Sequence, residues 1–108
     1  MINEKLKQIL SENSDVKKIQ VKYPQYYSSQ VGFVVDANFD KQTRSIVFLS
    51  ITQSPKPRSD KFHLIKTFLF DLRGTHEILA KDLDTNAVYK IGTDYTTAEG
   101  VLTITLSK

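Results

Sequence analysis

The chain of 108 residues contains no cysteine and no tryptophan. Without cysteine it can form neither a disulfide nor a thiolate metal site, so the fold has to form without these cross-links. A chain of this length can bury enough apolar surface to fold without such cross-links. We therefore expect one domain over residues 1–108, with a helix at residues 3–13 and a β region at residues 16–106.

Long apolar runs are also absent from the sequence. The longest one, residues 46–49, is far too short to cross a bilayer. Residues 1–10 carry Lys and Glu within their apolar spacing, which is typical of neither a signal peptide nor a membrane span. We therefore expect no membrane partner, and a location in the cytoplasm or in a virion.

No pattern in the sequence indicates catalysis or a bound cofactor. His63 and His76 have neither of the close spacings typical of paired zinc ligands. Residues 82–86 begin like a calcium loop, but Ala87 stands where the sharp turn needs Gly and Thr93 where a bidentate Glu belongs. The G-x-S-x-G elbow is absent, and no pair of carboxylates is singled out. We expect no catalytic residue, no metal and no cofactor, and hence no enzyme.

The net charge of +3 is distributed unevenly along the chain. Residues 1–73 carry 12 Lys and Arg against 7 Asp and Glu, which gives +5. Residues 74–108 carry 3 against 5, which gives −2 and restores the total of +3. A basic front can steer a polyanion or orient a partner, and it is equally typical of an ordinary solvated surface.

Helical spacing is found near the start of the chain. The apolar residues that recur with this period are Ile2, Leu6, Ile9 and Leu10. Asn3 can cap the first turn. A helix of about ten residues is marginal on its own. We therefore expect the apolar side of this short helix to dock either on the protein's own sheet or on a partner.

After residue 15 the apolar residues recur with a period of two, which is typical of half-buried strands. The strands that this pattern predicts are residues 19–23, 31–35, 44–52, 62–72, 78–83, 87–91 and 101–106. The strand at 44–52 contains a continuous apolar run, so we place it in the centre of the sheet. Polar turns are expected at residues 84–86 and 98–100, because short polar residues and glycine favour turns.

About seven short strands with polar turns predict a mainly β fold. We expect an antiparallel sandwich with one short N-terminal helix packed on an edge or an end. The alternative is an OB-like barrel of five strands. Such a barrel normally places a helix between its strands, and the pattern predicts no helix there.

The stretch from Phe70 to Leu106 resembles, in its pattern, small β-modules of phage tail and tail-fibre proteins. In those modules a strand-turn-strand unit precedes a G-x-D-Y-T motif, a Gly-containing turn and an alternating strand. The corresponding residues here are Gly92, Asp94, Tyr95, Thr96, Gly100 and residues 101–106. The same cadence resembles carbohydrate-binding and Ig-like modules. The resemblance implies assembly or attachment and carries no catalytic residues.

Two segments are predicted to contact a partner. The tyrosine segment, residues 23–27, offers a residue type that is frequent at interface centres. The Pro-Lys-Pro-Arg loop, residues 54–61, combines positive charge with a backbone stiffened by proline. The predicted contact residues are Tyr23, Tyr26, Tyr27, Lys56 and Arg58. The structural alternatives are a tyrosine cap on the fold with solvated hydroxyls and a charged hairpin connection.

These features predict a non-catalytic structural or adaptor protein of a larger assembly, such as a phage virion, that works through a protein partner or self-association. A nucleic-acid-binding module is the first alternative, because lysines beside tyrosines can bind single strands. The residues that would carry this function are Lys17, Lys18, Lys22, Lys56 and Arg58. The second alternative is a small inhibitor or immunity-type protein that blocks one enzyme with the same loops.

Overall fold

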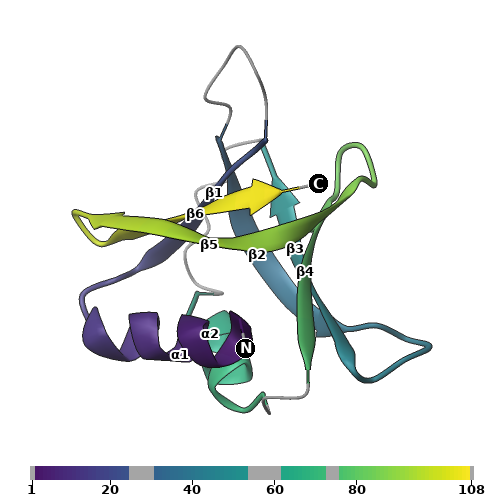
Figure 1. Ribbon diagram of the computed structural model, residues 1–108, viewed down its shortest axis with the longest axis horizontal. Helices are drawn as coiled ribbons and strands as arrows, with labels where there is room; N and C mark the ends of the chain where they lie inside the picture. The colour runs from purple at the N-terminus through teal and green to yellow at the C-terminus, as the bar shows by residue number, and fades with distance from the viewer. Residues whose placement is uncertain (1, 25–30, 54–61, 73–75, 108) are drawn as a thin grey trace.

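The computed structural model describes residues 2–24, 31–53, 62–72 and 76–107. These ranges contain two helices, α1 (Ile2–Glu12) and α2 (Phe62–Phe70). The strands are β1 (Lys18–Lys22), β2 (Val31–Phe39), β3 (Ile46–Thr52), β4 (Glu77–Asp82), β5 (Val88–Ala98) and β6 (Val101–Ser107). The six strands form one closed barrel (Figure 1).

The strands follow one another around the barrel in chain order, and β6 pairs with β1 to close it. The β3–β4 and β6–β1 pairs are parallel, whereas the other neighbours are antiparallel. The connection from β3 to β4 contains α2, as expected for parallel neighbours, which need a crossover. A helix followed by a three-stranded meander therefore occurs twice, as α1-β1-β2-β3 and as α2-β4-β5-β6.

The mainly β class and the N-terminal helix are confirmed, but the predicted antiparallel sandwich is wrong. The strands close into a single barrel with mixed pairing instead of forming two packed sheets. The barrel alternative is closer to the structure, although this barrel has six strands rather than five. The helix between strands that seemed to be missing from the sequence is α2.

The largest difference from the prediction is at residues 62–72, where the expected strand is replaced by α2. This segment is rich in aromatic residues, which favour strands by propensity. Its buried side chains, however, are Ile65, Leu69 and Leu72, which are spaced four and three residues apart. That spacing puts them on one face of a helix. Burial of this face in the core therefore overrides the local propensity.

Strand β5 is longer than the predicted strand at residues 87–91, because it continues to Ala98. Its register against β6 shifts between Ile91 and Tyr95. A Cβ at Gly92 would lie 2.4 Å from the carbonyl oxygen of Thr105, so only glycine allows this close approach. The predicted turn at residues 98–100 is confirmed, with positive φ at the two residues that follow Ala98, as a type I′ hairpin turn requires.

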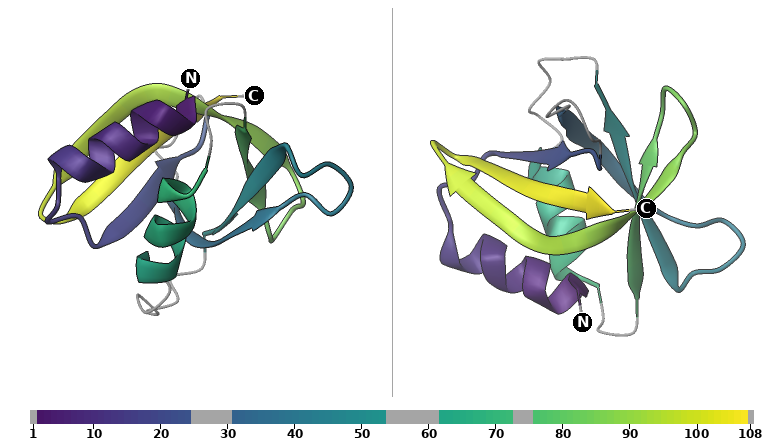
Figure 2. Two further views of the ribbon diagram at one scale, coloured as in Figure 1. Left: turned by 90° about the horizontal axis from the view of Figure 1, so that it is seen from below. Right: turned by 45° about the horizontal axis from the view of Figure 1, so that its top comes forward.

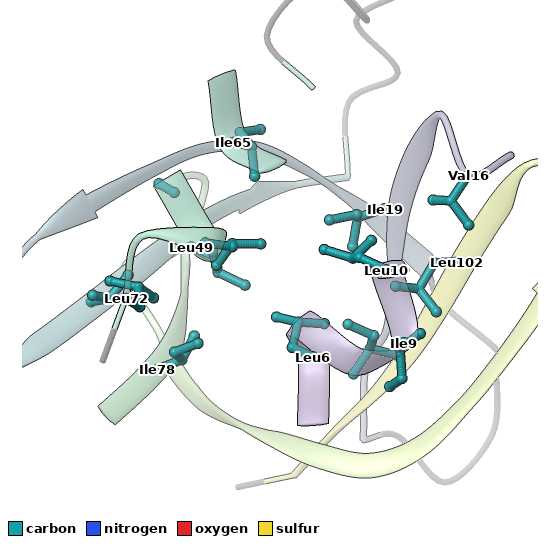
Figure 3. Packing of buried hydrophobic residues seen from close by; sticks show 14 residues of the cluster. Leu6, Ile9, Leu10, Val16, Ile19, Leu49, Ile65, Leu72, Ile78 and Leu102 are labelled. Carbon is teal, nitrogen blue, oxygen red and sulfur yellow. The ribbon is translucent and has the colours of Figure 1, made fainter. Parts of the chain in front are cut away.

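The barrel interior is filled in two layers. The larger cluster surrounds the helices, and Figure 3 shows Leu6, Ile9 and Leu10 of α1 lying beside Ile19 of β1 and Leu102 of β6. The smaller cluster, at the other end, contains Val21, Tyr23, Ile51, Ala80 and Leu106. The apolar side of α1 was expected to dock either on the protein's own sheet or on a partner. In the structure it packs on the protein's own sheet.

The two helices lie on the same side of the barrel, away from the β4–β5 turn (Figures 1 and 2). Lys7 Nζ of α1 donates a hydrogen bond to the Leu72 carbonyl just beyond α2. The C-terminus of α1 is capped by Asn13, whose Nδ2 donates to the Ile9 carbonyl at 2.8 Å. Neither helix in the described ranges has the length and apolarity needed to cross a bilayer.

Two leucines of α2 offer a matched test of the helix. Leu69 is 1% exposed and Leu64 is 66% exposed. Leu69→Ala should lower the free energy of unfolding by about 2–5 kcal/mol because it leaves a cavity. Leu64→Ala should change it by less than about 0.5 kcal/mol. Urea unfolding followed by circular dichroism measures both values, and a larger loss for Leu64→Ala would contradict the helix.

Candidate functional site

One end of the barrel carries both segments that the sequence predicts as contacts. The pairing of Lys22 with Val31 marks where β1 ends and β2 begins. Strands β3 and β4 also end here, where Ile51 lies beside Asp82, and β5 begins here at Val88. We call this the loop end; it lies opposite the helices in Figure 1. The tyrosine segment joins β1 to β2, and the Pro-Lys-Pro-Arg loop follows β3.

The predicted contact residues differ in what the structure shows of them. Tyr26, Tyr27, Lys56 and Arg58 lie outside the described residues. Tyr23 is described, and it is only 3% exposed. Its ring therefore fills the barrel and does not face a partner. The structure adds that both segments follow strands that end at the loop end.

Tyr23 closes the loop end from the inside. Its ring packs edge-on against Tyr89, with centroids 5.5 Å apart and an interplanar angle of 81°. A Cβ at Gly32 would lie 2.7 Å from the Tyr23 hydroxyl oxygen, so glycine at this position makes room for the tyrosine. The capping role expected as an alternative for the tyrosines thus describes Tyr23, but with a buried rather than a solvated hydroxyl.

The Tyr23 hydroxyl has an unusual environment for a polar group. It is buried, and no hydrogen-bond partner of good geometry is found for it in the described part of the chain. Burial raises the pKa of Tyr23 well above its ordinary value, and the nearby Asp82 carboxylate raises it further. The phenol therefore stays protonated at neutral pH. Asp82 is itself buried at the end of β4.

The Asp82 carboxylate shapes the turn between β4 and β5. Its Oδ1 accepts hydrogen bonds from the backbone N–H of Asp84 at 2.7 Å and of Thr85 at 3.2 Å. Asn86 then adopts a left-handed conformation with φ 64°, which asparagine tolerates well. The predicted hairpin turn is confirmed, and the aspartate that resembles a calcium ligand in the sequence bonds the backbone of the turn.

The same turn is fastened to the end of β3. The Leu83 N–H donates to the Ile51 carbonyl at 2.9 Å. Asp84 Oδ2 accepts from Thr52 Oγ1 at 3.0 Å and from the Gln53 N–H at 3.3 Å. Gln53 is the last described residue before the Pro-Lys-Pro-Arg loop. The root of this loop and the β4–β5 turn therefore form one hydrogen-bonded unit.

Apolar side chains are exposed around this unit. Leu83 is 53% exposed on the turn, and Val88 is 48% exposed at the start of β5. The sequence prediction includes Leu83 in a strand and misses its exposure. The alternation that buries Ile78 and Ala80 puts Leu83 out of phase with the core, and this signal was available in the sequence.

The lysines near β1 are exposed on the outside of the barrel. Lys18 and Lys22 alternate with buried residues along the strand, and Lys17 directly precedes it. Lys18 Nζ lies 4.2 Å from the centroid of the Phe33 ring on β2. The outward direction of the β1 lysines, which the alternating pattern indicates, is confirmed. We call Lys18, Lys22 and Phe33 the lysine face.

The His, Asp and Glu side chains of the described ranges are not gathered into a metal site. No group of three or more His, Cys, Asp or Glu residues there is arranged to hold a metal ion. His63 is exposed on α2, and His76 packs against Phe39 with ring centroids 5.4 Å apart. That the chain has no catalytic residue, metal or cofactor stays a prediction.

Tyr23→Phe tests the buried hydroxyl through its pH dependence. Because folding raises the Tyr23 pKa, the folded state holds this proton more tightly than the unfolded state, where the pKa is about 10. The contribution to stability is thus complete below about pH 9 and is lost as pH rises above 10, by up to about 1.4 kcal/mol per pH unit. Urea unfolding of both proteins between about pH 8 and 11.5 isolates this loss in the wild type. Parallel curves for the two proteins would contradict it.

The chain matches no protein-family model, no curated protein and no solved structure. The resemblance of residues 70–106 to phage tail modules therefore stays a prediction. What the protein binds has to be inferred from the geometry of its loop end and its lysine face.

Proposed function

We propose that the protein is a non-catalytic structural or adaptor component of a larger assembly and that the loop end is its contact surface. The observation that carries the proposal is Leu83, an exposed apolar residue on a turn that is fixed by hydrogen bonds. A fixed backbone loses little conformational entropy when a partner binds. The exposed apolar surface is extended by Val88 at the start of β5.

The composition of the segments rooted at the loop end supports a protein partner. Tyrosine and arginine are enriched at the centres of protein interfaces, and Tyr26, Tyr27 and Arg58 belong to these segments. A place in a phage virion is the finer form of this proposal, and its support is the resemblance of residues 70–106.

The barrel also restricts how a partner can bind. Each of the six described strands pairs with a neighbour on both sides, so none of them lies at a sheet edge to which a strand of another protein would be added. Contacts with the barrel therefore use side chains on its ends and its outer wall. This restriction favours the loop end, where Leu83 and Val88 are exposed.

Aspartate substitutions at the loop end test this proposal. The wild type should form a complex of mass well above 12.3 kDa, either with itself or with a product of a gene flanking its own, when the two are co-expressed. Leu83→Asp and Val88→Asp should each weaken that complex at least about tenfold, because a carboxylate replaces apolar contact area. Leu64→Asp is the matched control, since Leu64 is equally apolar and exposed but lies on α2. Light scattering coupled to size-exclusion chromatography measures the masses.

Two outcomes would count against the proposal. A strict monomer at about 100 µM that binds none of the flanking gene products would remove the adaptor role, since assembly components have micromolar or tighter contacts. A complex that survives both loop-end substitutions and is lost with Leu64→Asp would move the contact surface to α2. Circular dichroism of each variant verifies that it is folded.

A further inference from the structure

We propose that the lysine face, together with the threonines of β6 beside it, binds single-stranded nucleic acid. This activity goes beyond the adaptor role and uses the outer wall of the barrel instead of its loop end. Its three parts are two ammonium groups of β1, an aromatic ring of β2 and the hydroxyl groups of β6.

The first argument is the position of Phe33 relative to the lysines. Lys18 and Lys22 point outward four residues apart, which corresponds to about 13 Å along a strand. Phe33 pairs with Gln20, so its ring lies on the neighbouring strand between the two lysines. Lys18 Nζ lies over the ring, which shows that a ring face is turned toward an exposed ammonium. Single strands bind to this combination by stacking bases on rings and placing phosphates near ammonium groups.

The second argument is a hollow beside Lys22, at the end of β1. It has a volume of about 330 Å³ and is lined by Lys22 together with Thr103 and Thr105 of β6 and Thr96 of β5. Thr103 and Thr105 pair with Gln20 and Lys22, so their hydroxyls continue the row that begins on β1. Threonine hydroxyls are common donors to phosphate and sugar oxygens. The hollow therefore extends the lysine face with groups suited to a nucleic-acid backbone.

Asp94 determines which side of the hollow the nucleic-acid backbone would follow. It is the one carboxylate among the described residues that line the hollow, and it belongs to β5. A phosphate near Asp94 would be repelled, so the sugar-phosphate backbone is expected to follow the β1 side of the hollow. On the β5 side the carboxylate can accept hydrogen bonds from the amino groups of bases.

The residue types on this wall favour nucleic acid over protein. Lysine is depleted in protein interfaces, whereas it is a main contact of phosphate groups. Lys17 lies exposed directly before β1 and adds a third positive charge close to this strand. The basic first part of the sequence, with +5 over residues 1–73, would steer a polyanion toward it.

Fluorescence anisotropy tests the proposal with three labelled probes: a 20-nucleotide oligo-dT, a 20-nucleotide oligo-U and a 20-base-pair DNA duplex. The full chain should bind at least one single strand at about 50 mM salt, and the affinity should fall as salt rises. The double variant Lys18→Gln/Lys22→Gln should bind at least about tenfold more weakly. It should also show a salt slope smaller by about 1.4, because two phosphate contacts are lost.

The opposite wall of the barrel offers a matched control. There Lys81 Nζ lies 5.9 Å from the centroid of the Phe48 ring, compared with 4.2 Å for Lys18 and Phe33. Phe33→Leu should weaken binding because it removes the stacking ring while keeping an apolar side chain, whereas Phe48→Leu should not. Lys81→Gln/Lys90→Gln removes the same charge as the β1 double variant and should keep most of the affinity. Urea unfolding verifies that all variants are folded.

Three results would overturn the proposal. The first is no anisotropy change with any probe at about 50 mM salt and 100 µM protein, where weak electrostatic binding is still detected. The second is an equal loss of affinity in the two double-lysine variants, which would show a diffuse charge effect. The third is tighter binding of the duplex than of either single strand. None of these results bears on the adaptor role, which depends on Leu83 and Val88 and is measured by complex mass.

Discussion

The parallel pairing of β1 with β6 closes the sheet, and the other features of the structure depend on this closure. Residues 18–22 lie alongside residues 101–105 in register. A closed barrel has no free strand edges, and its interior has to be filled with side chains. Helix α1 fills one end with its apolar side, while Tyr23 and Asp82 occupy the other. The ends and the outer wall of the barrel are thereby left as the surfaces on which we propose contact with other molecules.

The direction of that closing pair is set by α2. If the direction of the chain alternated at every strand, the first and the sixth strands would be antiparallel. The crossover through α2 instead makes β4 run parallel to β3, and as a consequence β6 runs parallel to β1. The sequence prediction read residues 62–72 as one further alternating strand, and this error accounts for the extra strand and for the missed crossover. Phe62, Leu64 and Phe68 fit a strand, whereas Ile65 and Leu69 fit a helix. Which of the two periods is adopted depends on packing against the rest of the chain. A local sequence pattern carries no information about that packing.

The candidate surfaces could be predicted from the sequence to different degrees. The outward direction of Lys18 and Lys22 follows from alternation alone, which is a local property. The same alternation continues from Val21 to Tyr23 and indicates a buried ring, although the neighbouring tyrosines suggest a contact surface. That the tyrosine segment and the Pro-Lys-Pro-Arg loop leave from one end depends on strand order and closure. No sequence pattern carries that information, because it arises from pairing between distant residues.

Strand β1 joins the fold to both proposed surfaces. Its inward residues lie in the core, and Tyr23 directly after it closes the loop end, so changes at these positions would disturb the barrel itself. Its outward lysines are not part of that core, so we expect that they can be substituted without loss of the fold. Lys22 pairs with Val31 at the rim, and there the lysine face meets the loop end. A nucleic-acid strand on β1 and a protein on the loop end would therefore be neighbours, and the charge of one would influence the binding of the other.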